Sequence, residues 1–462
     1  MNKITLPYFF SFIISLLFIN TISAQESYSL EQCRTLALQS NVKMLNAELE
    51  VQSAIQTKRA TFTKYFPSIG ARAGYFQSNE HFIDLNLDME NSAVDITLTN
   101  PELNNILQNI IAEYGQQIKD NINVNINTKF IDRGLVGSVT AVQPIFAGGR
   151  IVTGNQLAKV GVQAAELKKE VAQNEVLITV EETYRLITSL HRKQESIRVA
   201  KELLDTLERD ASLAVEQGVI HKNDLLKVRL KKNELRSKEI QLKNGIVLTK
   251  MALCQQIGVT YHDSITFADK VEEIVDPWKY KVNHEEIQSQ RSEYNLLELS
   301  VQAVNLQKRM VIGEALPEAG VGIGYLYNNL MDKHKGNAVI FATVQVPISA
   351  WWEAAHQIKK YNIEEQIAEN NRRDLTEKML LQTQQLWNET EEVYLQIEVA
   401  QSAVEEATEN YKLSYDRYQA GVVSITDLLE AQTILQQSKD QYDDVCIEYL
   451  LKLQKYRLVT RN

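Results

Sequence analysis

The sequence has few of the residues that build metal sites and disulfide frameworks. Only 3 of its 462 residues are cysteine and 7 are histidine. Cys33, Cys254 and Cys446 do not have the spacing of metal ligands, and an odd number of cysteines does not suit a disulfide framework. The histidines are scattered, and no nucleophile and base stand together on a plausible frame. We therefore expect no bound metal, no cofactor and no enzymatic activity.

Long hydrophobic runs and net positive charge are also absent beyond the N-terminus. After Ala24, no apolar stretch reaches the ~20 residues that a transmembrane helix needs. The formal net charge of −10 becomes −11 when Lys3 is removed with the leader (−10 − 1). This charge argues against nucleic-acid binding, which favours a basic surface.

The hydrophobic run at the N-terminus has the pattern of a secretory signal. Lys3 supplies a positive charge, Leu6 to Ile19 form an apolar core of 14 residues, and Ile22-Ser23-Ala24 fits a cleavage site. A transmembrane anchor is the rival interpretation, but the run is shorter than a membrane span requires. The sequence thus predicts a signal peptide at 1–24 and export of the remaining chain.

Two short segments of similar sequence are typical of helical hairpin tips. In the later one, Gly421 can end a helix in the left-handed conformation, and Ser424 can cap the next helix, with Asp427 at the capping-box position. Five identities at an offset of 203 residues relate an earlier tip to it: Gly218, Val219, Asp224, Leu225 and Leu226 match Gly421, Val422, Asp427, Leu428 and Leu429. The chain therefore contains two copies of one hairpin.

A second internal similarity shows that the whole protomer is duplicated. Ten residues between Glu48 and Tyr75 recur without a gap at 298–325, an offset of 250. We predict a first repeat at 25–258, a second repeat at 285–462, and an inter-repeat segment at 259–284 that lacks helical periodicity. The difference between the offsets (250 − 203) gives the first repeat 47 extra residues.

Each repeat is predicted to contain a helix, two strands, a long helix, a tip and a return helix. In the first repeat we expect helices at Glu31 to Lys64, Arg150 to Gln217 and Lys222 to Gln256, with strands at Ile69 to Tyr75 and Leu135 to Phe146. In the second repeat we expect a strand at Ala338 to Ile348 and a return helix at Ser424 to Leu458. Both long helices have heptad spacing, which favours coiled-coil packing. One of them has 68 residues, or about 100 Å of helix.

The connections at the strand ends carry further expectations. Gly148 and Gly149 fit a strand-to-helix turn, and Pro144 and Pro347 are expected at strand ends, where a missing N–H group is tolerated. The 47 extra residues fall in a polar loop within 76–134, for which a short helix at 101–119 is predicted. We also expect the first helix of each repeat to stack end to end on the return helix.

Two strands per repeat indicate an oligomer. Four strands with long polar connections do not close a sheet, and an open sheet edge is untenable in lipid. If several chains each contribute their strands, the edges pair and a barrel closes. The fold class expected is therefore mostly helical with a membrane β-barrel, continued by a helical tunnel in the periplasm.

The sequence resembles the TolC family of outer-membrane efflux proteins, the outer membrane factors. The resemblance rests on the tandem duplication, on Gln143-Pro-Ile-Phe-Ala-Gly-Gly149 before the first long helix, and on the segment from Gly421 to Gln432. It implies a homotrimer with a twelve-stranded barrel in outer-membrane lipid. It also implies the exit duct of a tripartite efflux or type I secretion system, with a periplasmic adaptor and an inner-membrane transporter of RND or ABC type. The second repeat departs from the pattern at Ala350-Trp351-Trp352, where the first has the glycine pair.

The resemblance also assigns roles to individual residues, each of which has a structural alternative. The tips, Gly218-Val219 and Gly421-Val422, would meet the adaptor, although both glycines serve as helix ends in any case. Asp427 and Glu430 match an acidic pair that lines the periplasmic aperture, but Asp427 also suits a helix cap and Glu430 a solvated helix face. Asp224 is better explained as a cap, and Trp351 and Trp352 suit either a membrane interface or packing. For the whole chain, the alternative function is an exported structural or adhesive coiled-coil protein.

Overall fold

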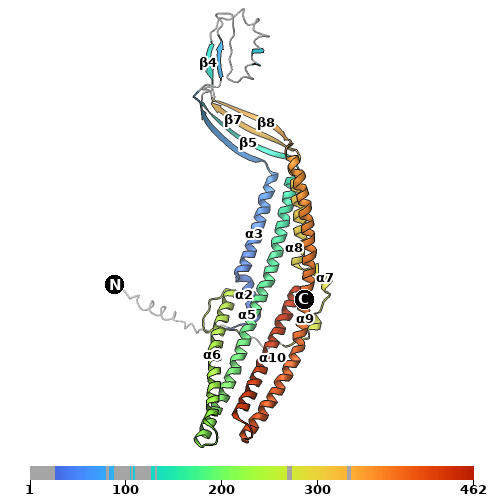
Figure 1. Ribbon diagram of the computed structural model, residues 1–462. Helices are drawn as coiled ribbons and strands as arrows, with labels where there is room; N and C mark the ends of the chain where they lie inside the picture. Colours follow the sequence, from blue (N-terminus) through green and yellow to red (C-terminus); the bar gives the residue numbers. More distant parts are fainter. Residues whose placement is uncertain are drawn as a thin grey trace, which may run out of the picture. The chain divides into compact units, whose positions relative to one another are not determined.

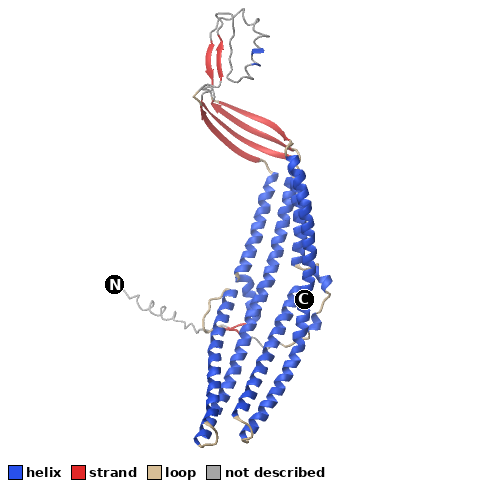
Figure 2. Ribbon diagram, viewed as in Figure 1, coloured by secondary structure: helices blue, strands red, loops and turns tan. Residues whose placement is uncertain are grey.

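The computed structural model describes residues 27–79, 83–87, 105, 108–109, 126–130, 133–267, 273–329 and 334–461. The expected signal peptide at 1–24 lies outside these residues. Long helices and a small antiparallel sheet make up most of the described chain (Figures 1 and 2). Neither compact unit corresponds to one predicted repeat. The helical unit combines Met1–Ala54, Val162–Val301 and Ile367–Asn462, and the sheet unit combines Ile55–Gly161 and Gln302–Gln366.

The helices follow the predicted order closely. They are α2 (Leu30–Ser40), α3 (Val42–Phe62), α5 (Arg150–Glu216), α6 (Lys222–Ile257), α7 (His284–Gln288), α8 (Ser292–Glu314), α9 (Ala350–Gln419) and α10 (Ile425–Thr460). The long helices α5 and α9 have 67 and 70 residues, and the return helices α6 and α10 have 36 each. No helix among the described residues is apolar over a length sufficient to cross a membrane.

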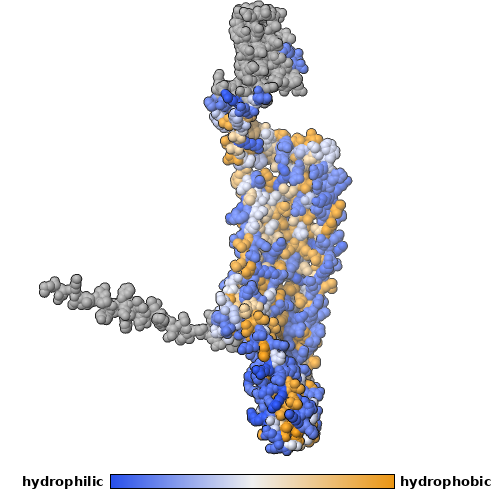
Figure 3. All heavy atoms as spheres, turned by 60° about the vertical axis from the view of Figure 1, so that its left-hand side comes forward, coloured by the Kyte–Doolittle hydropathy of each residue, from blue (hydrophilic) through white to orange (hydrophobic). Residues whose placement is uncertain are grey.

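The predicted heptad stripes are buried in the helical unit. On α5, Ile197, Leu204 and Leu207 are at most 7% exposed and pack in one cluster with Leu225 of α6 and Leu428 of α10. Burial of such a side chain contributes about 1.5–3 kcal/mol. On the face seen in Figure 3, hydrophilic residues cover much of the helical surface, with apolar ones exposed among them. This pattern confirms that the heptads join the two helical hairpins rather than form a globular core.

The first predicted helix, Glu31 to Lys64, is divided into α2 and α3 at Asn41, and a 3-10 turn, η1 (Thr63–Tyr65), follows α3. Asn41 has an extended ψ of 130°, and its side-chain oxygen accepts a hydrogen bond from the backbone N–H of Lys43 (2.9 Å). Its Nδ2 donates to the carbonyl of Gln256 in α6 (3.0 Å). Periodicity could not reveal this break, because the apolar spacing continues through it. The residue that binds the Asn41 side chain, Gln256, lies 215 residues away in the sequence.

In each repeat a helix begins close to the end of the return helix, although in the first repeat it is α3 and not the start of the predicted helix, which lies in α2. In the first repeat, the bond from Asn41 to Gln256 places the start of α3 at the C-terminus of α6. In the second repeat, the Arg461 guanidinium donates to Ser292 Oγ at the start of α8 (2.7 Å). Both junctions lie within the helical unit, and each brings the start of one helix close to the end of another.

The inter-repeat segment packs against the helices, with one contact that was not predicted. Its strand β6 (Thr266–Phe267) pairs in parallel with β1 (Ser27–Tyr28), close to the described N-terminus. A 3-10 turn, η2 (Pro277–Tyr280), follows before α7. Ile265 and Phe267 enter a buried cluster with residues of α2, α5 and α6. That cluster also holds Cys33 and Cys254, and all three cysteines of the chain are buried and outside any disulfide.

The sheet unit contains four antiparallel strands in the order β2-β5-β7-β8. They are β2 (Ser68–Gln77), β5 (Arg133–Ala147), β7 (Glu318–Asn329) and β8 (Lys335–Gln345). Two positional predictions need correction. Pro144 lies inside β5, where the register with β7 shifts between Pro144 and Phe146, and this irregularity accommodates the missing N–H. The strand predicted to reach Ile348 ends at Gln345, so Pro347 lies beyond it.

The register divides the sheet into an apolar face and a mixed face. Ile69, Ala141, Ile323 and Ile340 are directly paired across the four strands and therefore point to the same side. Neighbouring positions on this side are almost all apolar: Ala71, Ala73, Tyr75, Leu135, Val139, Val321, Tyr325, Ala338, Ala342 and Val344. The opposite side carries Arg72, Ser138, Thr140, Asn337, Thr343 and Gln345 among apolar residues and glycines. Ile340 is 88% exposed, so no residue that the structure describes covers the apolar face at that point.

The extra residues of the first repeat include a strand pair that was not predicted. β3 (Ile83–Leu87) and β4 (Ile126–Phe130) form a separate two-stranded antiparallel sheet. Of the helix predicted at 101–119, only residues 105, 108 and 109 are described, and these are helical; the rest of that prediction lies outside the described residues.

Candidate functional site

Both hairpin tips are built by the same glycine-centred helix end. Gly218 and Gly421 have φ values of +71° and +72°, the left-handed conformation that an L-residue adopts only with strain. The N–H of Gly421 donates to the carbonyl of Tyr418 and that of Val422 to the carbonyl of Arg417, both at 2.9 Å. Gly218 and Val219 make the matching bonds in the first tip. These are Schellman ends, which satisfy the last carbonyls of each long helix.

The tip valines are left exposed by this geometry. Val219 is 71% exposed and Val422 is 72% exposed. A Cβ atom built on Gly218 or Gly421 would meet nothing within 4 Å. Both tips therefore present small, apolar, uncovered surfaces, as the prediction of a partner-contacting tip requires.

The second tip continues into α10 through a complete capping box. Ser424 Oγ accepts a hydrogen bond from the N–H of Asp427 (3.3 Å), and the Asp427 carboxylate accepts one from the N–H of Ser424 (3.0 Å). The Ser424 hydroxyl also donates to that carboxylate (2.8 Å). These bonds lower the pKa of Asp427, first through the hydroxyl and then through the backbone, and the charge of Lys227 adds to the effect. The cap predicted for Asp427 is therefore confirmed, and its carboxylate stays ionised.

The first tip lacks this capping box. His221 stands at the N-cap of α6 and makes no side-chain capping bond. Asp224 occupies the position matching Asp427, but its carboxylate pairs with Lys227 at 3.3 Å. The same Lys227 ammonium donates to Thr426 Oγ1 of the second tip at 2.9 Å. The two tips are thus linked within one protomer by a lysine at the position that matches Glu430.

Asp427 and Glu430 lie on the exposed side of α10, as predicted. The opposite side is buried: Ile425, Leu428 and Leu429 pack in the cluster beneath the tips. Both acidic residues are exposed, and within the described part of the chain the Glu430 carboxylate has no hydrogen bond or ion pair. Their placement leaves both carboxylates available on one surface, although one protomer alone does not define what that surface faces.

Sequence reasoning missed the role of Lys227. Its signal was present, since the internal alignment places a lysine of the first repeat opposite Glu430 of the second (430 − 203 = 227). The alignment could not show that the two tips lie side by side, and the bond to Thr426 depends on that packing.

The strand-to-helix turns of the sheet unit differ between the repeats, as the sequence indicated. Gly148 and Gly149 both have positive φ values, +60° and +77°, and a Cβ on Gly148 would lie 2.0 Å from the carbonyl oxygen of Gly313. The second turn needs no left-handed residue. There the Trp351 indole N–H donates to the carbonyl of Ala315 (2.8 Å), whereas Trp352 is 70% exposed. Packing therefore accounts for Trp351 and leaves Trp352 with an uncovered ring.

Comparison with family models finds a match within the second repeat. The model of the family described as outer membrane efflux protein matches residues 297–453. This segment contains β7, β8, α9, the second tip and most of α10. No curated protein sequence matches the chain significantly.

Comparison with solved structures covers nearly the whole chain. CusC, from a study of folding and transmembrane channel formation, superposes with a TM-score of 0.74 at 14% identity, over 93% of this chain and 91% of its own. The outer membrane channel CmeC of Campylobacter jejuni gives 0.73 at 14% identity, over 93% and 85%. VceC, an outer membrane protein of Vibrio cholerae, gives 0.70 at 13% identity, over 93% and 96%. These likenesses establish the fold, and with the family match they confirm the resemblance predicted from the sequence.

Proposed function

We propose that this chain, whose residues 297–453 match the outer membrane efflux protein family, is the outer-membrane exit duct of a tripartite efflux or type I secretion system. In this role it conducts substrates passively from a periplasmic adaptor and an inner-membrane transporter of RND or ABC type to the exterior. The sheet unit lies in the outer membrane and the helices extend into the periplasm. The comparisons give no support to the alternative of an adhesive surface protein.

The apolar face of the four-stranded sheet carries this proposal. A row of four apolar residues, Ile69, Ala141, Ile323 and Ile340, crosses the sheet, and Ile340 and Ile69 are 88% and 76% exposed. The mixed face holds Arg72 and Thr343. Alternation of an apolar outer side with a polar inner side is the pattern of a membrane barrel strand. The strands have 10, 15, 12 and 11 residues, and a tilted barrel strand needs about 9–11 to span the bilayer.

The edges of the sheet require additional copies of the chain. β2 and β8 are the outer strands in the order β2-β5-β7-β8, so each leaves one row of backbone N–H and C=O groups without a strand partner in the described chain. In a bilayer these groups must be paired. Pairing β8 of one protomer with β2 of the next closes a barrel, and three protomers make twelve strands. Because the family resemblance implies three copies, we infer a homotrimer.

A direct test of the duct combines assembly with conductance. We expect the mature protein to fractionate with the outer membrane as a heat-resistant trimer, because edge pairing removes every free strand edge. In planar bilayers the purified trimer should produce discrete, long-lived conductance steps. Monomers in the outer-membrane fraction, or trimers that do not conduct, would contradict the duct and favour a structural surface protein.

The tips supply a second test, directed at the adaptor. We expect Gly421→Trp to abolish efflux while trimers remain in the membrane. A left-handed non-glycine residue costs about 1–2 kcal/mol, which a trimer tolerates, and the added ring occupies the open space above the tip. Measurements are the minimal inhibitory concentration of an exported compound and site-specific crosslinking of the adaptor to the tip.

The matched control is Gly421→Asn. Asparagine tolerates the left-handed conformation and adds little volume, so efflux should be retained. Adaptor crosslinking that is equally strong in Gly421→Trp and in the parent protein would show that the tip is not the docking surface.

A further inference from the structure

The two return helices carry opposite charges at one pair of corresponding positions near their starts. Asp224 of α6 matches Asp427 of α10, so both repeats share the first carboxylate. At the second position, three residues further on, α10 has Glu430 whereas α6 has Lys227. A cap at the start of a helix explains the shared aspartate. It does not explain why the next position is negative in one repeat and positive in the other.

The Lys227 ammonium lies between the two tips. Its Nζ is 3.3 Å from Asp224 Oδ1 in the first tip and 2.9 Å from Thr426 Oγ1 in the second. Thr426 directly precedes Asp427, whose pKa is lowered by the hydrogen bonds of Ser424 and further by the charge of Lys227. The Lys227 side chain is 40% exposed, so its charge also acts on the surrounding water. The ammonium therefore stands beside the acidic pair rather than apart from it.

This one lysine changes the net charge beside the acidic pair by a third. Of the four residues at the corresponding positions, Asp224, Asp427 and Glu430 are negative and Lys227 is positive, which gives −2 per protomer (1 − 3). Without the ammonium, the same four positions carry −3. In a trimer the difference is between −6 and −9 (3 × −2 and 3 × −3).

We propose that Lys227 is a selectivity-determining residue of the duct, whose ammonium offsets part of the negative charge of the aperture and limits its preference for cations. This inference rests on the proposed function, in which the acidic pair lines the periplasmic aperture. Rings of charged side chains at a narrow opening determine which ions enter it. The three ammonium groups of a trimer reduce the repulsion that negatively charged compounds meet there.

A graded series of substitutions at Lys227 tests the proposal on the purified trimer. Single-channel recording at about 0.1 M salt measures the cation-to-anion permeability ratio. We expect Lys227→Arg to leave the ratio as in the parent channel, and Lys227→Met to raise it about twofold or more because one positive charge per protomer is lost. Lys227→Glu should raise it further. All three residues have helix propensities close to that of lysine, so α6 is kept.

Two controls separate the charge of Lys227 from its bond and from general electrostatics. Thr426→Val removes the acceptor of the bridge between the tips but leaves the ammonium in place, so the permeability ratio should not change. Lys222→Met removes the same charge from an exposed position five residues earlier in α6, ~140° around the helix from Lys227. It should change the ratio less than Lys227→Met. If either control raises the ratio as much as Lys227→Met, the proposal is overturned.

The double variant Asp427→Asn and Glu430→Gln distinguishes failure of this proposal from failure of the aperture. If the double variant loses cation selectivity and Lys227→Met behaves as the parent channel, the role of Lys227 is overturned and the aperture stands. If the double variant retains cation selectivity, both are overturned. Adding Lys227→Met to the double variant should restore part of the cation preference, because Asp224 then has no counter-charge. No restoration would also contradict the role of Lys227.

Discussion

Ile340→Arg is expected to remove trimers from the outer membrane, whereas Thr343→Arg three residues along the same strand is expected to leave them in place. Ile340 lies on the apolar face of β8 and is 88% exposed in the protomer. In the proposed barrel it contacts lipid hydrocarbon. A lipid-facing arginine near the bilayer midplane costs about 2–4 kcal/mol. A trimer carries three such arginines, so the total is comparable with the stability of many folded proteins.

Thr343→Arg is a matched control because it adds the same side chain to the other side of the strand. Thr343 pairs with Gly320 of β7, on the face that also carries Arg72 and Gln345. A charged residue there faces the aqueous interior of the proposed barrel and keeps its hydration. The measurement is the amount of heat-resistant trimer in the outer-membrane fraction for each variant. Equal trimer yields, or a loss confined to Thr343→Arg, would show that the apolar face does not contact lipid.

Neutralising the acidic pair, by Asp427→Asn and Glu430→Gln together, is expected to remove the cation selectivity of the channel. Each protomer places both carboxylates on the exposed side of α10, and a trimer would gather them into two rings of three around the aperture. Closely spaced like charges concentrate cations at a narrow opening and bind multivalent cations there. We therefore expect the parent channel to select cations and to be blocked by multivalent cations from the periplasmic side.

The two single variants should differ in how strongly they reduce cation selectivity, because the two carboxylates have different surroundings in the protomer. The Asp427 carboxylate is engaged by Ser424 and lies in the field of Lys227. Glu430 has no such neighbours among the described residues, so we expect Glu430→Gln to have the larger effect. Single-channel recording measures the cation-to-anion permeability ratio of each variant. It is done at about 0.1 M salt, at which the electrostatic screening length is about 10 Å.

Glu448→Gln is the control for these recordings. It removes the same charge from an exposed position on the same helix, 18 residues from Glu430 (448 − 430). Selectivity and multivalent block should remain as in the parent channel. If the double variant also retains both properties, the acidic pair does not line the pore and Glu430 is a solvated helix residue.

The helical framework was open to prediction because its signals are local or repeated. The 36-residue helix α10 begins after Ser424, the predicted cap, and both tips turn at the predicted glycines. Heptad spacing identified the buried side of α5, since the residues that share a helix face recur at a fixed interval. The strands were found by alternation, although Gln345 rather than Ile348 ends β8.

Contacts between distant segments were not open to prediction. The break at Asn41 depends on Gln256, the bridge between the tips depends on Lys227 meeting Thr426, and the pairing of β1 with β6 joins Tyr28 to Phe267. The two partners of each contact are about 200 residues or more apart in the sequence. No local sequence pattern at either partner indicates which distant residue it will meet.

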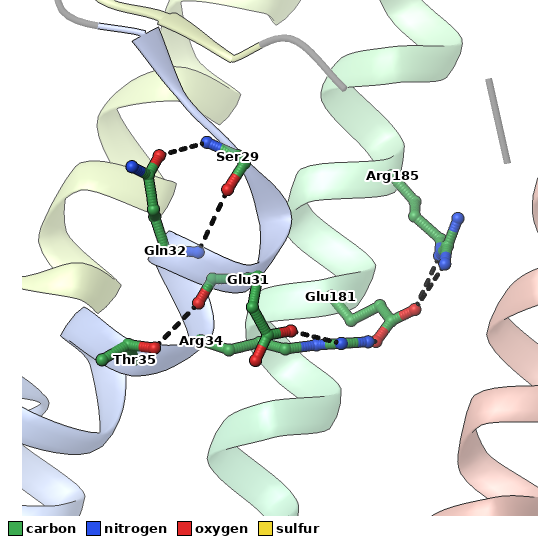
Figure 4. A network of polar contacts seen from close by, with 7 residues as sticks. All are labelled: Ser29, Glu31, Gln32, Arg34, Thr35, Glu181 and Arg185. Atoms are coloured by element: carbon green, nitrogen blue, oxygen red, sulfur yellow. Dashed lines mark hydrogen bonds and ion pairs between the residues drawn. The ribbon is translucent and has the colours of Figure 1, made fainter. Parts of the chain in front are cut away.

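By itself, the sequence determined that this protein is a tandem duplication of a helix, two strands and a long helical hairpin, because periodicity and internal similarity are properties of the chain. The tertiary structure alone decided which residues of the four strands share the apolar face, since that depends on the register of Ile69, Ala141, Ile323 and Ile340 across the sheet. It also decided that Arg34 and Arg185 both pair with the buried carboxylate of Glu181 (Figure 4). Charges brought together from separate helices are a consequence of packing, which no single stretch of sequence records.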